Sequence, residues 1–337
     1  MPADDLWHCS RPASEPTLAI VNHRGIDMSS SIAFRTPQDA PAWQRWLVFS
    51  PVARIIIFVA LAFGIGYAVH NVLLALGWMS KTATPLQHAL AVLSMELLSS
   101  VIAYAVLVLL VERRALRELS LRTVPTYGLG GLVAGFLIFS AVVGLLWLFG
   151  SYHVLGVNQQ VNWLPAVLVA GVGAGIGEEI ITRGVLFRIV EEGLGTWWAL
   201  GISAAFFGIA HIFNPNATLW SSLAIAIEAG VLLALIFHVT RTLWACIGLH
   251  AAWNISQGTI YGIPVSGTDA KGWLVSSRTG PDWLSGGAFG AEASVVALAV
   301  CSTVSLALLV IAWRRRSFVR PRWSRRATVS CAATPTT

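Results

Sequence analysis

The sequence has few charged residues and few cysteines. Only 11% of its 337 residues are charged, against about a quarter in a typical soluble domain. Lipid-facing helices cannot carry charge cheaply, so this deficit, with 56% hydrophobic residues and a mean hydropathy of +0.71, indicates a membrane protein. The four cysteines are scattered and form no CxxC pair, which argues against a thiolate metal site or a disulfide framework.

Three further patterns are missing. There is no HExxH motif, so nothing in the sequence forces a zinc protease site. No cleavable signal peptide is visible. The two halves show no evident relationship, which is weak evidence against a transporter built from inverted repeats.

Long apolar runs recur from residue 52 onward. A helix needs roughly 20 residues to cross a bilayer, and backbone amides in lipid must be bonded internally, which leaves helices or barrel strands. The runs are nearly continuous, which excludes the alternation of barrel strands. We therefore predict an all-α fold, a polytopic integral membrane bundle of about eight transmembrane helices. The predicted spans are 52–78, 88–111, 127–149, 163–190, 197–213, 219–238, 243–262 and 292–313.

These spans divide the chain into six segments. The two ends are predicted to be a disordered polar tail and a basic tail, both cytoplasmic. The outer loop before the last span suggests no function from its sequence. The segments are the polar tail 1–45, the N-terminal transmembrane helices 46–160, a catalytic core 161–262, an extracytoplasmic loop 263–290, the last transmembrane helix 291–313 and the basic tail 314–337.

Basic residues collect in segments that eight spans would place on one side of the membrane. These segments are the N-terminal tail, the loop after the second span, Arg241 and the C-terminal RRRSFVRPRWSRR; the opposite loops offer only Lys81, Lys271 and Arg278. The positive-inside rule then predicts that both termini lie in the cytoplasm, in a protein of the plasma membrane. Topology thus explains the net charge of +6 without a nucleic-acid partner.

The stretch GEEIITRG, residues 177–184, places two glutamates and an arginine inside an apolar span. A charge at the bilayer centre costs on the order of 2.5–3.5 kcal/mol, so each needs a partner or a cavity. Glu179 and Arg183 are four residues apart, in the order that favours a structural ion pair. Glu178 is rotated about 100° away and has no cation on its own face. Such an acid readily accepts a proton, as a general base must; the alternative is a structural hydrogen bond between helices.

Two histidines and an asparagine follow on later spans. His250 and Asn254 share a helix face and can both donate hydrogen bonds to a developing oxyanion, although alone they would more often tie helices together. His211 alone fits packing as well as function. Together with Glu178, these residues favour a catalytic site, and we expect the four side chains to converge on one polar cavity. Glu228, midway along the sixth span, has no role in this scheme.

Three short blocks carry a resemblance to a known family. EEIITR has the form EExxxR, FGIAH the form FxxxH and HAAWN the form HxxxN, in this order and on late spans. Together they resemble the CPBP family of intramembrane proteases. That family includes the type II CAAX prenyl endopeptidases and the Abi group of bacteriocin-processing and immunity proteins. The resemblance covers about residues 165–260.

The resemblance implies a peptidase whose site lies inside the bilayer. Glu178 would be the catalytic glutamate and, with His211, would activate a water molecule. His250 and Asn254 would stabilise the tetrahedral oxyanion. The supporting residues would be Glu179, Arg183 and Phe207.

Members of this family are commonly labelled metalloproteases, which makes Zn²⁺ the cofactor to consider. Glu178, His211 and His250 could bind zinc with one open position. The same groups could equally run a glutamate-activated water reaction without a metal, and the sequence favours this second option slightly.

Two other function classes are compatible with the sequence. A transporter or channel could use the intramembrane polar groups as a substrate or proton path, with Glu228 as its best support. A non-catalytic immunity factor or scaffold could retain the fold alone. For the peptidase, the partners would be the bilayer and a membrane-associated peptide or protein, with lipidated substrates as one option.

Overall fold

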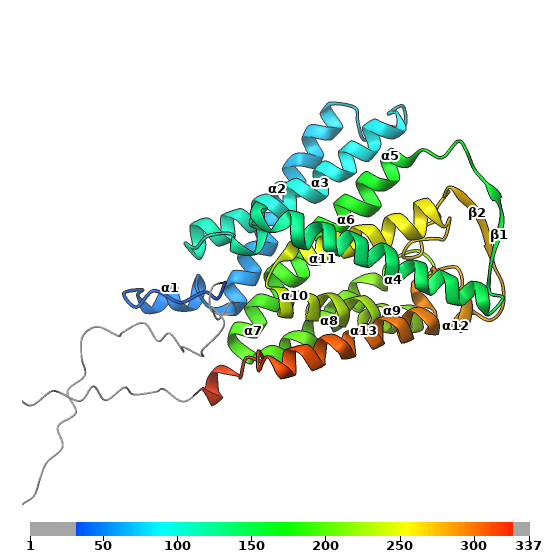
Figure 1. Cartoon of the computed structure of the whole chain (residues 1–337). Coiled ribbons are helices and arrows are strands. Elements are labelled where there is room, and N and C mark those ends of the chain that lie inside the picture. Colours follow the sequence, from blue (N-terminus) through cyan, green and yellow to red (C-terminus); the bar gives the residue numbers. More distant parts are fainter. Residues whose placement is uncertain (1–31, 326–337) are drawn as a thin grey trace, which may run out of the picture.

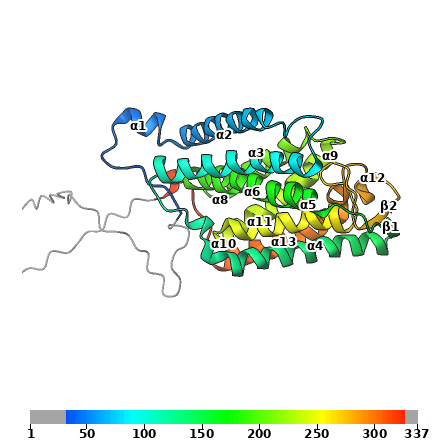
Figure 2. The same ribbon diagram turned by 90° about the horizontal axis from the view of Figure 1, so that it is seen from above.

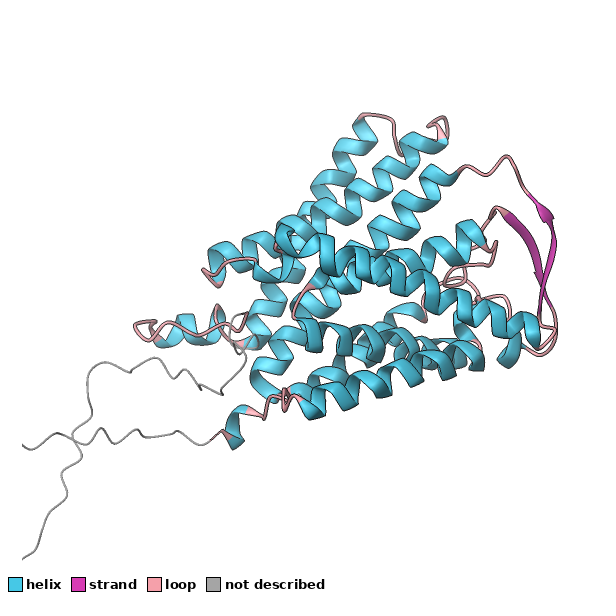
Figure 3. Ribbon diagram, viewed as in Figure 1, coloured by secondary structure: helices cyan, strands magenta, loops and turns pink. Residues whose placement is uncertain are grey.

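The computed structural model describes residues 32–325, and nearly all of its regular structure is helical (Figure 3). Within these residues six helical stretches are long and apolar enough to cross a membrane. The prediction of a helical, polytopic membrane protein is therefore confirmed. The six stretches are Pro51–Ala75, Pro85–Val111, Leu121–Leu148, Trp163–Leu194, Leu219–Thr240 and Val295–Arg314.

Two more helices occupy the positions of the predicted spans 197–213 and 243–262. They are α8 (Thr196–His211) and α11 (Leu243–Asn254), the latter extended by the π-helix η8 (Ile255–Ile260). Neither is among the six stretches, so the count of eight crossings stays a prediction.

Two of the six long stretches, Pro51–Ala75 and Val295–Arg314, are α-helical throughout, and the other four combine α-helix with wider π-helix. The α-helical parts are α2 (Pro51–Ala75), α3 (Pro85–Ala105), α4 (Leu129–Leu148), α5 (Trp163–Ala166), α6 (Ala174–Glu179), α7 (Arg188–Leu194), α9 (Leu219–Ile225), α10 (Leu232–Thr240) and α13 (Val295–Arg314). The π-helical parts are η1 (Val106–Val111), η4 (Val124–Gly128), η5 (Val167–Gly173), η6 (Ile180–Phe187) and η7 (Ala226–Val231).

Short elements complete the chain. Helices α1 (Ala42–Leu47) and α12 (Asp282–Ser285) and the 3₁₀ turns η2 (Arg117–Leu119), η3 (Leu121–Thr123), η9 (Ala291–Ala293) and η10 (Arg322–Ser324) lie outside or at the ends of the long helices. Strands β1 (Tyr152–Val157) and β2 (Leu274–Arg278) pair antiparallel, with an irregular register between Val154 and Gly156. This sheet joins two loops that are far apart in the sequence. The hydropathy pattern of the sequence did not predict it.

Local sequence signals explain where the long helices begin. Ser50 caps α2 by accepting a hydrogen bond from the backbone N–H of Ala53, with Pro51 at the first helical position. Thr84 and Gln87 form a reciprocal capping box at the start of α3, again followed by a proline. These caps satisfy amides that would otherwise be left open at the membrane boundary.

Helix α11 lies in the middle of the bundle, between α4 and α6 (Figures 1 and 2). All of its residues except Trp244 are buried. Its most extensive contact is with α4, and glycines make that contact close. A Cβ on Gly135 would collide with the Leu249 carbonyl, and one on Gly248 would collide with the Gly128 carbonyl. The two helices therefore pack backbone against backbone, as small residues permit in membranes.

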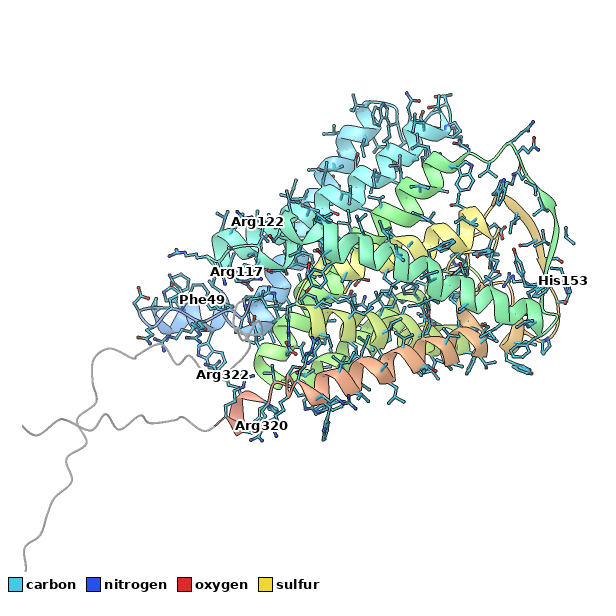
Figure 4. The ribbon with its side chains drawn as sticks, viewed as in Figure 1. Phe49, Arg117, Arg122, His153, Arg320 and Arg322 are labelled. Atoms are coloured by element: carbon cyan, nitrogen blue, oxygen red, sulfur yellow. The ribbon has the colours of Figure 1, made fainter. Side chains whose placement is uncertain are left out.

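The two ends of the bundle differ in charge. Arg117, Arg122, Arg320 and Arg322 lie at one end, whereas His153 lies at the other (Figure 4). The described chain also begins and ends at the basic end (Figure 1). This arrangement agrees with an even number of crossings.

The N-terminal segment packs on the bundle from Ile32 onward. Ile32 is buried, and the backbone N–H of Phe34 donates to Glu192 at 3.0 Å. The Phe34 and Phe49 rings lie 5.7 Å apart. Apolar side chains of this segment therefore find partners on the bundle, and the disorder of the predicted tail 1–45 stays a prediction. The rest of the two predicted tails, 1–31 and 326–337, lies outside the described residues.

Candidate active site

Glu178 and Glu179 are the last two residues of α6, where the α-helix gives way to the π-helix η6. Asn254 holds the same position at the end of α11, directly before η8. A π-helical turn shifts the faces that the following residues present, and such turns are frequent at functional sites. The two carboxylates and the amide thus lie beside irregular turns in two helices that pack together.

Alternating glycines let α6 and η5 lie tightly between two neighbours. A Cβ on Gly175 would meet the Ala251 side chain and the Ile247 carbonyl of α11 at 3.2 Å. On the other side, a Cβ on Gly173 would collide with the carboxylate of Glu96 in α3. Close helix packing explains these glycines, and it brings Glu96 beside the segment that carries Glu178.

Glu179 and Arg183 form the predicted ion pair. Arg183 Nη1 lies 2.9 Å from Glu179 Oε1, and neither side chain is exposed. Arg183 Nη2 also donates to the carbonyls of Ala229 and Gly230, each at 3.0 Å, which ties η6 to η7. The guanidinium lies 4.8 Å from the centroid of the Phe207 ring. Both terminal nitrogens of the buried guanidinium therefore have partners, as the cost of burial requires, whereas Arg183 Nε and Glu179 Oε2 have no hydrogen-bond partner among the described residues.

The same glutamate orients a histidine. His250 Nδ1 lies 2.9 Å from Glu179 Oε1, so the carboxylate accepts a hydrogen bond from this ring nitrogen. That contact leaves Nε2 of His250 available to another group. Glu179 is thus shared between Arg183 and His250, a link that the sequence did not reveal.

Glu178 and His211 face one another. His211 Nδ1 lies 2.7 Å from the Phe207 carbonyl; a carbonyl only accepts, so Nδ1 carries the proton. Nε2 then lies 4.0 Å from Glu178 Oε2. This gap is too long for a direct hydrogen bond, but a water beside it could contact both groups.

The surroundings of Glu178 differ from the expected ones. We expected a carboxylate enclosed in a low dielectric, but 38% of its side chain is exposed. Only Oε2 is enclosed, and it has no hydrogen-bond partner among the described residues. The physical reason is position: Glu178 lies about 100° around the helix from Glu179, whose carboxylate contacts His250 in the core.

A small cavity connects three of the four predicted site residues, His211, His250 and Asn254. Its volume of about 30 Å³ is enough for one or two water molecules. Glu178 is not part of the lining and reaches His211 from outside the cavity. The expected convergence is therefore complete for the histidines and Asn254, and for Glu178 it is limited to the contact with His211.

Asn254 uses part of its hydrogen-bonding capacity for packing. Its Nδ2 donates to the Ala170 carbonyl at 2.8 Å, across the contact between α11 and η5. The amide has a second N–H, and it is this group that can serve a ligand in the cavity.

Sequence reasoning missed several polar residues of the site. Ser266 and Glu292 line the cavity together with Glu228, and both belong to the segment around the outer loop. The only available signal was compositional: Glu292 is one of few acids in an acid-poor chain, and its assignment to the start of a span concealed it.

The predicted zinc ligands do not form a metal site in this arrangement. Nowhere in residues 32–325 do three His, Cys, Asp or Glu side chains come close enough together to hold a metal ion. His250 Nδ1 is engaged by Glu179, and Glu178 approaches His211 alone.

Comparison with known protein families gives one match. The family described as type II CAAX prenyl endopeptidase, Rce1-like, matches residues 160–256. No curated protein matches the chain. The matched segment contains EExxxR, FxxxH and HxxxN, and it ends just after Asn254, before the outer loop. Residues 160–256 of this helical membrane protein are therefore similar to the Rce1-like type II CAAX prenyl endopeptidases.

Proposed function

We propose that the protein is an intramembrane endopeptidase that hydrolyses peptide bonds with water activated by Glu178 and His211. The observation that carries this proposal is the arrangement of His211, with its Nδ1 fixed by the Phe207 carbonyl and its Nε2 facing Glu178 at 4.0 Å. An acceptor nitrogen and a carboxylate on either side of a water molecule are the groups that general-base catalysis needs.

In this reaction, Glu178 takes a proton from the water while the water oxygen attacks the peptide carbonyl carbon. His211 Nε2 accepts a hydrogen bond from the same water and orients it. When the C–N bond breaks, the proton held by Glu178 passes to the leaving amine. The products are a carboxylic acid and an amine, and both protein groups return to their starting state.

His250 and Asn254 serve the other side of the carbonyl. With Nδ1 held by Glu179, Nε2 of His250 faces the cavity and, when protonated, donates to the oxyanion. The free N–H of Asn254 is a second donor on the same helix face. Donors that are fixed before the charge develops stabilise a transition state more than groups that must first reorient.

Glu179, Arg183 and Phe207 act as positioning residues in this scheme. Glu179 orients His250, Arg183 neutralises Glu179, and Phe207 contributes both its carbonyl to His211 and its ring to Arg183. The three residues hold the two histidines that line the cavity.

The substrates we propose are membrane-associated peptides or proteins, with lipidated C-terminal peptides as one class to test. We also propose that the protein resides in the plasma membrane with both termini in the cytoplasm. The clustering of arginines at the end where the described chain begins and ends supports that orientation.

The test is a comparison of peptide termini in membranes that contain the wild type, Glu178→Gln or the control Asp282→Asn. Asp282 is an exposed acid outside the site. We expect new termini with the wild type and the control, and none with Glu178→Gln at equal abundance. Identical termini in all three samples would contradict the proposal and favour a scaffold. Ion or solute flux that is lost in Glu228→Gln, without cleavage, would instead indicate a transporter.

A further inference from the structure

A second cavity lies at the basic end of the bundle, away from the proposed active site. Its volume is about 290 Å³, close to the lower limit of about 300 Å³ for small-molecule sites. The N-terminal segment before α2, the end of α7 and the C-terminal segment with η10 enclose it. We call it the basic pocket, because its lining contains one acid, Glu192, and four arginines, Arg35, Arg54, Arg322 and Arg325.

The acid of the basic pocket is already neutralised. Glu192 Oε1 accepts hydrogen bonds from the backbone N–H of Phe34 and from Arg188 Nη1, each at 3.0 Å. Its Oε2 lies 2.6 Å from Arg54 Nη2. Each oxygen of this carboxylate therefore has a donor, and Glu192 does not compensate the other arginines of the pocket.

Those other arginines have no acid beside them in the described chain. Arg35 and Arg322 are exposed, and within residues 32–325 their side chains form no ion pair and no hydrogen bond. Arg325 donates from Nε to the Arg320 carbonyl at 2.7 Å and from Nη2 to the Glu192 carbonyl at 3.1 Å. Both acceptors are backbone groups without a formal charge. The basic pocket therefore carries an excess of positive charge.

The buried arginine contributes a donor that has no acceptor. Arg54 is 2% exposed, and its terminal nitrogens contact Glu112 at 2.8 Å and Glu192 at 2.6 Å. Its Nε, in contrast, has no hydrogen-bond partner among the described residues. The guanidinium lies 4.7 Å from the centroid of the Phe34 ring. A buried donor without a partner costs stability, and an acceptor supplied by a ligand would remove that cost.

The basic pocket lies where helices enter the membrane. Pro51, which lines it, is the first residue of the candidate span Pro51–Ala75. Gly193, also in the lining, is the last residue but one of the span Trp163–Leu194. Lipid headgroups lie at this depth, on either side of the hydrocarbon core. The rings of Phe34 and Phe49 add apolar wall to the pocket, and Figure 4 shows Phe49 and Arg322 at this end of the bundle.

We propose that the basic pocket binds a phosphate group, carried by the headgroup of an anionic phospholipid or free in solution. Arginine binds phosphate through charge-assisted hydrogen bonds that are often bidentate. Arg35 and Arg322 belong to opposite ends of the described chain, so a phosphate between them also joins these two segments. The depth of the pocket favours the lipid as the source. The pocket shares no lining residue with the cavity of the proposed active site, so binding does not depend on the peptidase function.

The experiment compares the full-length wild type with two double variants, purified in one detergent. Arg35→Gln with Arg322→Gln changes the pocket, whereas Arg117→Gln with Arg122→Gln is the control. Arg117 and Arg122 are exposed at the same end of the bundle but do not line the pocket, so both variants lose the same charge (Figure 4). We measure Tm in sodium phosphate against sodium chloride of equal ionic strength and pH. We also measure it in micelles that contain phosphatidylglycerol or phosphatidylcholine, and native mass spectrometry counts the bound phospholipids.

We expect phosphatidylglycerol to raise the Tm of the wild type and the control by roughly 2–4 °C relative to phosphatidylcholine. The pocket variant should bind the lipid about ten- to thirtyfold more weakly, the usual effect of two basic residues beside an anionic headgroup, and should retain fewer phospholipids. Without ligand the three proteins should have similar Tm, because exposed substitutions rarely change stability. A difference between variant and control in sodium phosphate as well would identify free phosphate as a ligand; a difference with phosphatidylglycerol alone would identify the lipid.

Equal shifts in the pocket variant and the control, with both ligands, would refute the site, since they would show only diffuse attraction to the basic end. No shift in the wild type would refute it too. Gly193→Leu gives a second test if the arginine variant does not fold. A Cβ there meets only the Pro51 side chain, at 3.9 Å, so the longer side chain fills the pocket without changing its charge. Gly201→Leu, at an exposed glycine of α8, is its control. A full shift in Gly193→Leu would place the ligand elsewhere and contradict the proposal.

Discussion

At the basic end of the bundle, buried carboxylates lie against arginines, whereas the two acids in the cavity have no such partner within the described residues. Glu112 contacts three arginines, Arg54 at 2.8 Å, Arg114 at 2.7 Å and Arg188 at 3.0 Å. Burial alone would raise the pKa of Glu112, but Arg188 and its neighbours hold it below its ordinary value. There the charges balance and join α2, α3 and α7 into one unit.

The buried acids that line the cavity lack such balancing cations among the described residues. Glu228 and Glu292 are as buried as Glu112, yet neither lies within ion-pair distance of an arginine or lysine in the described chain. Balanced ion pairs can be explained by structure alone, but unbalanced buried acids cost stability and call for a functional reason. The unbalanced acids therefore favour the cavity, and not the larger charged network, as the place of the proposed chemistry.

The largest effect should come from the acid that faces His211. Glu178→Gln should lower kcat by about 10²–10⁴-fold, because the amide cannot take up the proton of the attacking water. Abundance and Tm should stay near the wild type, since Glu178 belongs to no ion pair with an arginine or lysine in the described chain. The measurement is peptide cleavage by purified protein with Tm recorded on the same sample. Wild-type turnover would remove Glu178 from the mechanism.

The next largest effect should come from breaking the buried ion pair of Glu179 and Arg183. Arg183→Ala should destabilise the fold by roughly 3–5 kcal/mol, because it leaves Glu179 buried without its cation. Thermal unfolding and membrane abundance are the readouts. The double change Glu179→Gln with Arg183→Gln should recover abundance but not turnover, since His250 loses its carboxylate partner. An Arg183→Ala protein as stable as the wild type would contradict the structural role.

A smaller loss of rate is expected from the proposed oxyanion donor. Asn254→Ala should lower kcat by about 10²–10³-fold, the usual cost of removing one such donor. Part of any change in Tm would come from the lost hydrogen bond to Ala170, so Asn254→Asp is the matched variant of equal size. If both variants keep wild-type kcat, the donor lies elsewhere.

The smallest effect should be the pH dependence of stability that arises from the carboxylates at the basic end of the bundle. The arginines hold the pKa of Glu112 and Glu118 below the ordinary value of 4.5, against the effect of burial. Stability from such groups is complete above the ordinary value and is lost as pH falls through the lower folded value. Tm should therefore decrease below about pH 4.5, and less so in Glu118→Gln. An acid-insensitive Tm would contradict this.

Much of the fold was predictable because the length and hydropathy of a segment are enough to identify a candidate membrane span. The stretch Pro85–Val111 begins within a few residues of the predicted start because Thr84 and Pro85 mark it. The ion pair of Glu179 and Arg183 followed from their spacing along one helix. Contacts within a single helix depend on local geometry, and local geometry is what a sequence pattern conveys.

Contacts between distant segments were not predictable in the same way. Nothing in the spacing of Glu179 and His250 shows that they meet, and the pairing of β1 with β2 joins loops that follow different spans. Apolar runs alone place Glu292 at the start of the last span. In the structure it lies in η9, before that helix, and its carboxylate accepts a hydrogen bond from the backbone of Ser266. Such features arise from tertiary packing, which periodicity does not record.

The close seam between α4 and α11 bears on how the protein could be divided into parts. The family match begins at residue 160, so α4 lies outside it, and so do Ser266 and Glu292. A fragment limited to 160–256 would expose the glycine-lined groove around Gly248 to lipid and would leave the cavity without its outer wall. The matched segment is therefore not an excisable module: transplanting it into another membrane protein would require a replacement for α4 and for the loop that carries Ser266 and Glu292.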